Sequence, residues 1–522
     1  MRISTGQYFA NSATTYTKNF GDTSKTQDQI SSGQRIQTAS DDPIGAAKLL
    51  QLRQQSGVLD QYKSNITSAN NSLLSEESVL SNITTALQRA QELAIQAGNG
   101  VLTDDDRVSL SSEIGQIKET VYGLLNTKDA NGQYLFSGSK STTQPYLPNS
   151  DGSYTYQGDE TQLSLQVSDA LSVATNDTGF SIFDLATNVS RTQTTQTAPA
   201  TVDGKLSVSN GQLGALTTYN EKFAPGQPYT LTFTSGTQYT VSDAQGNDVT
   251  AQTGGKGSYN YNKEGGDSIS LYGVTFSVDT NVAKGEDANA VLAGRTFSLK
   301  ATPDSITANR LASNTSTAQM TTGSVTNSAV YTAGFPTNGA VIKFTSPSAY
   351  QVFAQPLSDT SKPVASGNYD GSGSLTTAGV TFNISGTPAS DDQFTVSANT
   401  HSTQNVLDTL NQLQVALSTP TANNPAAQLK LHNAIESAIG NLQSADNRIE
   451  VTRGSIGARG NALDIQSAEI ESLQIANAST QSQIGDTDMA EATSKLTLQQ
   501  TMLQAAQLSF AKISQLSLFD RL

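Results

Sequence analysis

The sequence predicts a multidomain α+β protein, in which a long antiparallel helical bundle is built from both termini and all-β domains are inserted in the middle of the chain. Three observations support this fold class. Apolar residues recur at every seventh position towards both ends, alternating strand patterns fill the middle, and part of the middle is repeated in tandem. The 522 residues also exceed the size at which a single hydrophobic core stops growing.

The composition argues against several classes of function. The chain has no cysteine, which excludes disulfides, thiolate chemistry and cysteine-ligated zinc. A formal net charge of −15 leaves no basic surface for nucleic acid. No apolar run approaches the length of a membrane-spanning helix, so we expect no membrane insertion. The N-terminus lacks the apolar core of a cleavable signal peptide, which favours the cytoplasm unless export uses another route.

The N-terminal part of the chain is expected to be helical. Residues 1–40 are polar, and their helical periodicity is weak. Asp41, Asp42 and Pro43 mark a clear helix start, because carboxylates and a first-turn proline both suit a helix N-terminus. The heptad positions that follow predict a rod that ends near Gly98, and they are Leu59, Ile66, Leu73, Leu80, Leu87 and Ala94.

Three consecutive aspartates, Asp104, Asp105 and Asp106, lie in the first turn of the next expected helix. We interpret them as complementing the helix dipole rather than as metal ligands. The only imidazoles belong to His401 and His432, and no nucleophile and base or paired carboxylates occur at workable spacing. We therefore expect no catalytic residue, no metal site, no cofactor and no enzymatic activity.

The middle of the chain is expected to be β structure. Alternation after Asn131 predicts one or two hairpins up to about residue 190, and the Thr- and Gln-rich stretch 191–203 is typical of a linker. A tandem repeat then predicts two related β modules, 204–302 and 325–398. Its matching pairs are Leu231 to Ser235 with Ile342 to Ser346, Gly273 to Phe276 with Gly379 to Phe382, and Phe297 to Leu299 with Phe394 to Val396.

Helical heptads return after His401 and predict that the chain doubles back. Ile449, Ile456 and Leu463 share one line, so the rod domain is expected to consist of 41–190 and 403–484, with its helices paired within the chain.

The last segment, 485–522, carries its own heptad line, which we call the terminal seam. Its members are Met489, Ala492, Leu496, Leu503, Ala506, Phe510, Ile513, Leu516 and Phe519. An isolated helix is marginal in water, and the only intrachain partner available, 1–40, is poor in large apolar residues. We therefore expect an assembly interface here, with 1–40 and 485–522 mobile in the monomer and forming axial-core helices on assembly.

A motif near the N-terminus carries a family likeness. The stretch from Ile30 to Ala47 reads ISSGQRIQTASDDPIGAA, and it resembles the N-terminal signature of bacterial flagellins. The positions that carry the likeness are Ser32, Gly33, Arg35, Ile36, Asp41, Asp42, Pro43 and Gly45. The stretch from Arg453 to Leu463 is similar to the matching C-terminal helix. Asn131 to Gly138 and Lys512 to Phe519 resemble the junction members of this family more than filament flagellin.

The resemblance implies a secreted structural protein of the bacterial flagellum, exported unfolded and assembled as a layer at the hook–filament junction. The implied partners are copies of the chain in a ring or helical layer, a neighbouring junction protein, flagellin, and an export chaperone on the C-terminal helix. Filament flagellin is an alternative within the family. A secreted adhesin or glycan-binding protein that uses the β repeats is the alternative from another class.

Overall fold

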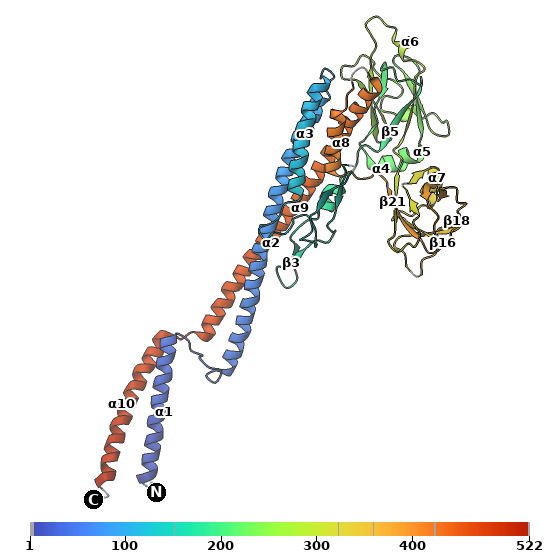
Figure 1. The fold of residues 1–522 in the computed structure, drawn as a ribbon. Coiled ribbons are helices and arrows are strands. Elements are labelled where there is room, and N and C mark those ends of the chain that lie inside the picture. The colour runs from blue at the N-terminus through green and yellow to red at the C-terminus, as the bar shows by residue number, and fades with distance from the viewer. Residues whose placement is uncertain (1–4, 151, 322, 359, 422–423, 520–522) are drawn as a thin grey trace. The chain divides into compact units, whose positions relative to one another are not determined.

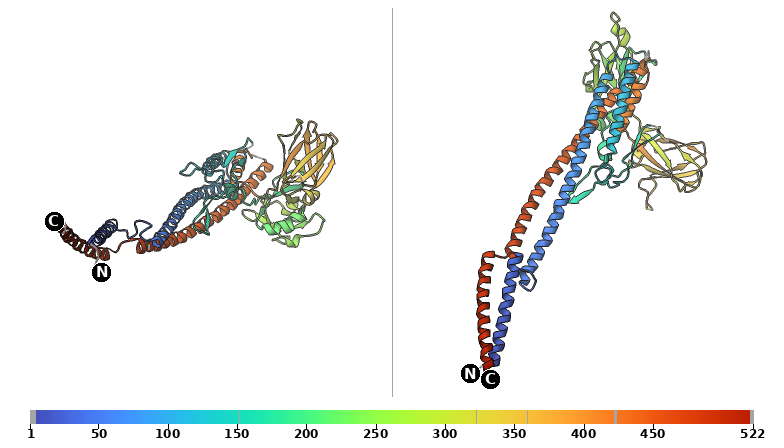
Figure 2. Two further views of the ribbon diagram at one scale, coloured as in Figure 1. Left: turned by 90° about the horizontal axis from the view of Figure 1, so that it is seen from below. Right: turned by 60° about the vertical axis from the view of Figure 1, so that its left-hand side comes forward.

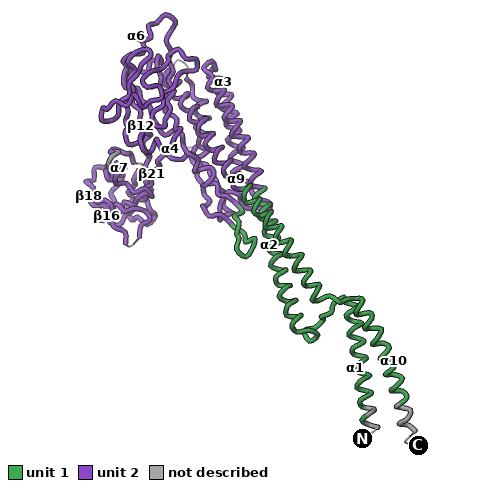
Figure 3. The backbone as a smooth tube through the Cα atoms, turned by 180° about the vertical axis from the view of Figure 1, so that it is seen from behind, with its two compact units in different colours: residues 1–74, 164–175, 456–522 green, residues 75–163, 176–455 purple. Residues whose placement is uncertain are grey.

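The computed structural model describes residues 5–150, 152–321, 323–358, 360–421 and 424–519, and its α+β architecture agrees with the predicted fold class (Figure 1). The chain forms two compact units (Figure 3). The first unit contains residues 1–74, 164–175 and 456–522, and the second contains residues 75–163 and 176–455. Each unit is therefore assembled from segments that are far apart in the sequence.

Five main helices account for the helical part. They are α1 (Thr5–Ser32), α2 (Pro43–Ala97), α3 (Asp104–Leu125), α9 (Pro425–Gly485) and α10 (Met489–Phe519). The 55 residues of α2 form one uninterrupted helix from the predicted start to the predicted stop. The remaining helical pieces are α4 (Leu216–Thr218), α5 (Ala224–Gly226), α6 (Ala288–Leu292), α7 (Ser328–Gly334), α8 (Val406–Ser418) and the turns Phe180–Asp184, Tyr219–Phe223 and Thr250–Gln252.

The predicted heptad lines are buried, which confirms the paired rods. In the first unit, Asn477 Nδ2 donates to the Leu52 carbonyl at 3.0 Å, so α9 lies directly against α2. In the second unit, Arg453 Nε donates to Glu77 Oε1 at 2.9 Å and repeats that pairing. The buried heptad residues are Leu59, Ile66, Leu73, Leu80, Leu87, Ala94, Ile449, Ile456, Leu463 and Ile470. Helical burial of this kind supplies the stability that the isolated helices lack.

The start of α3 also agrees with the sequence. Thr103 is its N-cap, and it exchanges hydrogen bonds with Asp106 in a capping box, with Thr103 N donating to Asp106 Oδ2 at 3.0 Å. Asp104 forms an ion pair with Arg107 in the same turn. The aspartate run thus caps and charges a helix start, as the first-turn position indicates.

Two short hairpins interrupt the helical part. Strands β1 (Tyr146–Pro148) and β2 (Tyr154–Tyr156) pair in the second unit, and β3 (Ser164–Gln166) and β4 (Ser172–Ala174) pair in the first. The second hairpin is held on α2, because Tyr62 Oη donates to Asp169 Oδ1 at 2.9 Å. This confirms the predicted hairpins between the helices and the repeat.

The first β module contains two sheets. One has the strand order β5 (Thr192–Ala198), β12 (Thr296–Ala301), β8 (Tyr229–Phe233) and β9 (Tyr239–Ser242), and all its pairs are antiparallel. The other has β10 (Asp267–Leu271), β11 (Val274–Thr280) and β6 (Leu206–Val208), with β7 (Gln212–Leu213) also on β11. The core between them includes the fully buried rings of Phe223, Tyr229, Phe233, Tyr239, Phe276 and Phe297.

The second module is a larger antiparallel sheet. Its strands follow the order β14 (Gln319–Met320), β20 (Val380–Ser385), β15 (Gly323–Val325), β13 (Ser305–Arg310), β21 (Gln393–Asn399), β16 (Ala340–Ser346), β17 (Ala349–Ala354) and β18 (Ala365–Asn368), and β19 (Ser374–Thr377) pairs with β20. Its core includes Phe344, Phe382 and Phe394.

The two modules share the predicted repeat. In the first, Phe297 lies opposite Leu231, and in the second Phe394 lies opposite Ile342, which is the matching residue of the repeat. Each module also has a tight turn with two positive φ angles, at Tyr272 and Gly273 and at Ala378 and Gly379. Such turns match the twist of the strands that they connect. The sequence repeat is therefore a structural one.

The interpretation of residues 191–203 as a linker is wrong, because β5 occupies 192–198 and completes the first sheet. Likewise, β13 precedes the second expected module and pairs with β21. Every second residue of β5 is exposed, so its polar composition imitates a linker. Each module thus begins earlier than the repeat pattern indicates.

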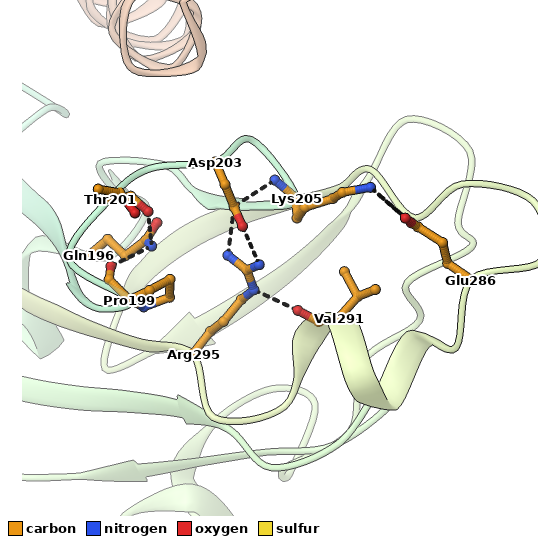
Figure 4. Close-up of polar contacts among 8 residues, drawn as sticks. All are labelled: Gln196, Pro199, Thr201, Asp203, Lys205, Glu286, Val291 and Arg295. Atoms are coloured by element: carbon orange, nitrogen blue, oxygen red, sulfur yellow. Dashed lines mark hydrogen bonds and ion pairs between the residues drawn. The ribbon is translucent and has the colours of Figure 1, made fainter.

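An ion pair closes the loop that follows β5. Arg295 donates through both terminal nitrogens to Asp203, at 2.8 Å and 2.6 Å, and its Nε donates to the Val291 carbonyl (Figure 4). Lys205 and Glu286 form a second pair nearby, at 2.9 Å. The Arg295 guanidinium lowers the pKa of Asp203 to about 2.

Candidate assembly interface

The family motif forms a loop, residues 33–42, between α1 and α2. Gly33 ends α1 with a φ of +71°, a left-handed conformation that glycine adopts without steric cost. Ser32, at the last helical position, accepts a hydrogen bond from Gln37 Nε2 at 2.8 Å. Ile36 is buried. The loop therefore has a defined course set by its own side chains.

Arg35 bonds the motif loop to the segment between α9 and α10. Its backbone N donates to the Gly485 carbonyl at 2.7 Å, and its Nη2 donates to the Ile484 carbonyl at 2.7 Å. In return, Thr487 N donates to the Gly33 carbonyl at 2.9 Å. The two chain ends are thereby joined within the first unit, although hundreds of residues separate them in the sequence.

The two aspartates of the motif have different partners. Asp41 accepts from Thr38 N at 2.9 Å and pairs with Lys25 Nζ at 2.7 Å, and this lysine holds the pKa of the carboxyl well below its usual range. Asp42 accepts from Gly45 N at 2.9 Å and so bonds the first turn of α2. Asp41 therefore shapes the loop, and Asp42 starts the helix.

Pro43 and Gly45 complete the start of α2. Pro43 is its first residue, where a missing N–H costs no hydrogen bond. A Cβ on Gly45 would lie 2.5 Å from Asp42 Oδ2 and 2.6 Å from Ile36 Cδ1. Glycine is needed here because the loop packs directly on the helix backbone. Residues of the family motif thus form the loop, the hydrogen bonds from Arg35 to the end of α9, and the start of α2.

A polar cavity of about 570 Å³ lies beside the motif loop in the first unit. Its lining combines both signs of charge and includes Asp22, Lys25, Arg35, Asp41, Asp488, Glu491 and Lys495. Within the described part of the chain, no three or more His, Cys, Asp or Glu side chains are grouped to hold a metal ion. The mixed charges of this cavity therefore suit polar contacts among α1, the motif loop and the start of α10.

The terminal seam faces α1. Figures 1 and 2 show α10 lying along α1, and the Phe510 ring stacks on Tyr16 with ring centres 6.4 Å apart. Ala492 is buried, and the other seam positions that are partly covered are Leu496, Leu503, Ala506 and Phe510. Met489 is exposed. The side chains of Ile513, Leu516 and Phe519 lie outside the described residues.

Residues 1–40 are expected to be too poor in large apolar residues to cover the seam, but α1 lies along it and covers part of it. Tyr16 of α1 contacts the seam, and among the described side chains of α1 only Thr23 and Thr26 are buried. Their hydroxyls donate to carbonyls of their own helix, to Asn19 O at 2.7 Å and Asp22 O at 2.9 Å. Satisfied hydroxyls are tolerated inside a contact, but they contribute little apolar area.

A second apolar face of α10 stays uncovered, and the heptad reading missed it. We call it the outer stripe, and it consists of Leu498, Met502 and Leu508, whose side chains are 56%, 51% and 67% exposed. At about 100° per residue, Leu498 and Met502 lie one turn apart and Leu508 lies about 120° around the axis from Met502, so the three residues span a broad arc outside the terminal seam. Spacings of four and six residues do not form a regular helical pattern, so the stronger heptad line concealed these residues.

The two histidines, His401 and His432, belong to the second unit. His432 Nε2 is 3.2 Å from Glu436 Oε1 on α9, and this contact raises the pKa of His432. Glu436 in turn accepts from Ser277 Oγ of β11 at 2.5 Å. His401 has a positive φ at the end of the second module. The hydrogen bond from Ser277 to Glu436 therefore joins α9 to the first β module.

Comparison with known proteins finds family models that match both ends of the chain. The family model described as the bacterial flagellin N-terminal helical region matches residues 3–141, and the one described as the bacterial flagellin C-terminal helical region matches residues 439–522. Both helical ends of the chain are therefore similar to the helical regions of bacterial flagellins. The motif loop, α1, α2, α3 and α10 all lie within the matched regions.

Two curated relatives share one name. Flagellar hook-associated protein 3 of Salmonella typhimurium is 37% identical over 188 residues, which are 36% of this chain and 58% of the relative. The Escherichia coli protein of the same name is 36% identical over 210 residues, 40% of this chain and 63% of the relative. The chain thus aligns with about three fifths of the length of these two relatives.

Among solved structures, the crystal structure of flagellar hook associated protein-3 from Legionella pneumophila is 21% identical. It covers 83% of this chain and 98% of its own, with a TM-score of 0.47. Flagellins are also among the relatives, for example that of Clostridium tyrobutyricum, which is 34% identical over 122 residues, 22% of this chain and 32% of the flagellin. No helix within the described ranges has the length and apolar character needed to cross a membrane.

Proposed function

We propose that this chain is a structural subunit of the bacterial flagellum that forms the junction layer between hook and filament and assembles through its terminal helices. The observation that carries the proposal is the outer stripe, an apolar face on α10 that α1 leaves open. The names of the curated relatives support the location. The protein is secreted in this account, and it acts without enzymatic activity.

The energetics favour assembly over an isolated pair of helices. Leu498, Met502 and Leu508 would each contribute ~1.5–3 kcal/mol if fully buried. Phe20 on α1 is a further large apolar side chain that is 57% exposed. Terminal helices of neighbouring subunits present the same surfaces, so copies of the chain are complementary partners. The segments 1–40 and 485–522 form the axial core of that assembly and are mobile before it.

The motif loop adds a second role. Arg35, Asp41 and Asp42 fix the point at which both chain ends turn between the rod helices and the terminal helices. A fixed connection lets the terminal helices of each subunit enter the assembly in one orientation. The remaining partners in the proposal are the adjacent junction protein, flagellin, and an export chaperone that covers the C-terminal helix before secretion.

The proposal is tested by placing a charge in the outer stripe. Met502→Asp should leave the monomer folded, because residue 502 is half exposed, and should abolish the junction layer and motility when it replaces the native protein. Gln504→Asp is the matched control, since it adds the same charge on an exposed polar position of the same helix. Circular dichroism checks the fold, and electron microscopy of flagella checks the layer. Normal junctions with Met502→Asp would refute the role of the stripe.

Filament flagellin is the second candidate, because both family models describe flagellin regions. The two functions differ in the number and place of the subunits. Labelled electron microscopy of intact flagella should find this chain in a single short layer next to the hook. Labelling along the whole filament would favour flagellin instead.

A further inference from the structure

A cavity of about 420 Å³ lies where the two β modules meet in the second unit. Its walls come from the first module, from the segment between β12 and β13, and from α7 of the second module, which Figure 1 labels. The residues that matter for its chemistry are Arg191, Tyr219, Gln227, Lys300, Asp304 and Tyr331. This volume is in the range of sites that hold one small molecule.

The two tyrosines of the cavity occupy matching positions of the tandem repeat. Tyr219 N donates to the Ala215 carbonyl at 3.0 Å, and Tyr331 N donates to the Asn327 carbonyl at 2.9 Å. Each ring packs against a phenylalanine four residues later, Phe223 and Phe335, with centres 5.5 Å and 5.1 Å apart. The duplication has thus brought two supported aromatic rings to one cavity.

Two cations of the cavity have no acidic partner. The Arg191 guanidinium lies 5.1 Å from the centre of the Tyr219 ring, and its buried Nε has no hydrogen-bond acceptor. Across the described residues, no ion pair involves Arg191 or Lys300, although both are partly buried. Asp304 instead accepts from Tyr331 Oη at 2.8 Å. A partly buried cation that forms no ion pair loses hydration without a compensating contact, which an anionic ligand would supply.

We propose that this cavity binds an acidic sugar. The partly buried ring of Tyr331 offers a flat apolar surface for the C–H face of a sugar ring, whereas the buried Tyr219 ring supports the Arg191 guanidinium at the cavity wall. The carboxylate of the sugar lies between Arg191 and Lys300, where it supplies the missing counter-charge. Asp304 and Gln227 are placed at the same cavity to bond sugar hydroxyls. The aromatic surface of Tyr331 favours a ring-shaped ligand over an extended acidic peptide.

The test uses the full chain and three probes: digalacturonic acid, galactose and a triglutamate peptide. Isothermal titration calorimetry should detect digalacturonic acid, with binding that weakens as salt rises. Arg191→Gln and Lys300→Gln should each weaken it at least ~10-fold, the effect of losing one charge-assisted hydrogen bond. Lys343→Gln removes a lysine that pairs with Asp391 outside the cavity, and it should leave binding unchanged.

Tyr331→Ala should abolish binding, whereas Tyr331→Phe keeps the ring and should retain most of it. Thermal unfolding of every variant shows whether the modules remain folded. No binding of digalacturonic acid would overturn the proposal, as would galactose binding equally well or triglutamate binding more tightly. The measurement needs no flagellar assembly, so its failure would leave the proposed junction function untouched.

Discussion

At the scale of single residues, Arg35 combines two roles that the motif alone does not reveal. Its backbone and its guanidinium both donate to carbonyls at the end of α9, Gly485 and Ile484. A motif match identifies Arg35 as characteristic of the family, but its partners lie at the other end of the chain. The motif therefore singles out Arg35, but its hydrogen bonds to Gly485 and Ile484 become visible only in the folded chain.

Asp203 provides a residue-scale prediction about pH. Its folded pKa of about 2 is lower than the ordinary value of 3.8, so its charge stabilises the first β module above about pH 4. This contribution is lost as the pH falls through the folded pKa. Asp203→Asn should therefore destabilise the module at pH 6, and its difference from the native protein should shrink between about pH 4 and pH 2. Hydrogen exchange of the β12 amides, compared between the variant and the native protein at each pH, measures the stability of the module.

The matched control is Glu264→Gln, which removes one charge from an exposed position of the same module. It should change exchange little at any pH in this range. An Asp203→Asn difference that stays constant down to pH 2 would contradict the assigned role of the Asp203–Arg295 pair.

At the scale of elements, periodicity predicted the helices well, because apolar burial repeats along them. The rods followed their heptads, and the terminal seam is the partly covered face of α10. Strand β5 was missed because its exposed alternate positions are Thr and Gln, which are equally common in linkers. The contact of α1 with α10 was missed because the buried residues described in α1, Thr23 and Thr26, are polar, and hydrophobic periodicity does not register them.

Two neighbouring leucines on α2 test the assignment of the buried face. Leu73 is 2% exposed and Leu74 is 60% exposed, on the same helix and in the same unit. Leu73→Ala should lower the free energy of unfolding by about 2–5 kcal/mol, since it leaves a cavity between packed helices. Leu74→Ala should change it by less than about 0.5 kcal/mol. Urea unfolding followed by circular dichroism compares them, and equal losses would refute the assigned face.

At the scale of the whole molecule, the chain begins and ends in helices, and the β modules are inserted between them. The chain leaves the rod through β5, builds two related modules, and returns through α8 into α9. The sequence indicated this order from the positions of heptads and repeat. It did not indicate the cavity between the modules, because the six residues that define its chemistry are spread from Arg191 to Tyr331 and gather only when both modules fold.

The central claim is that neighbouring subunits cover the outer stripe in the assembled flagellum. The chain contains no cysteine, so Met502→Cys and Ser372→Cys each introduce a single thiol, the second on an exposed turn of the second module. Maleimide labelling of the purified monomer and of isolated flagella measures the accessibility of each thiol. We predict that residue 502 reacts in the monomer and is protected in flagella, whereas residue 372 reacts in both. Equal reactivity of residue 502 in monomer and flagella would contradict the account.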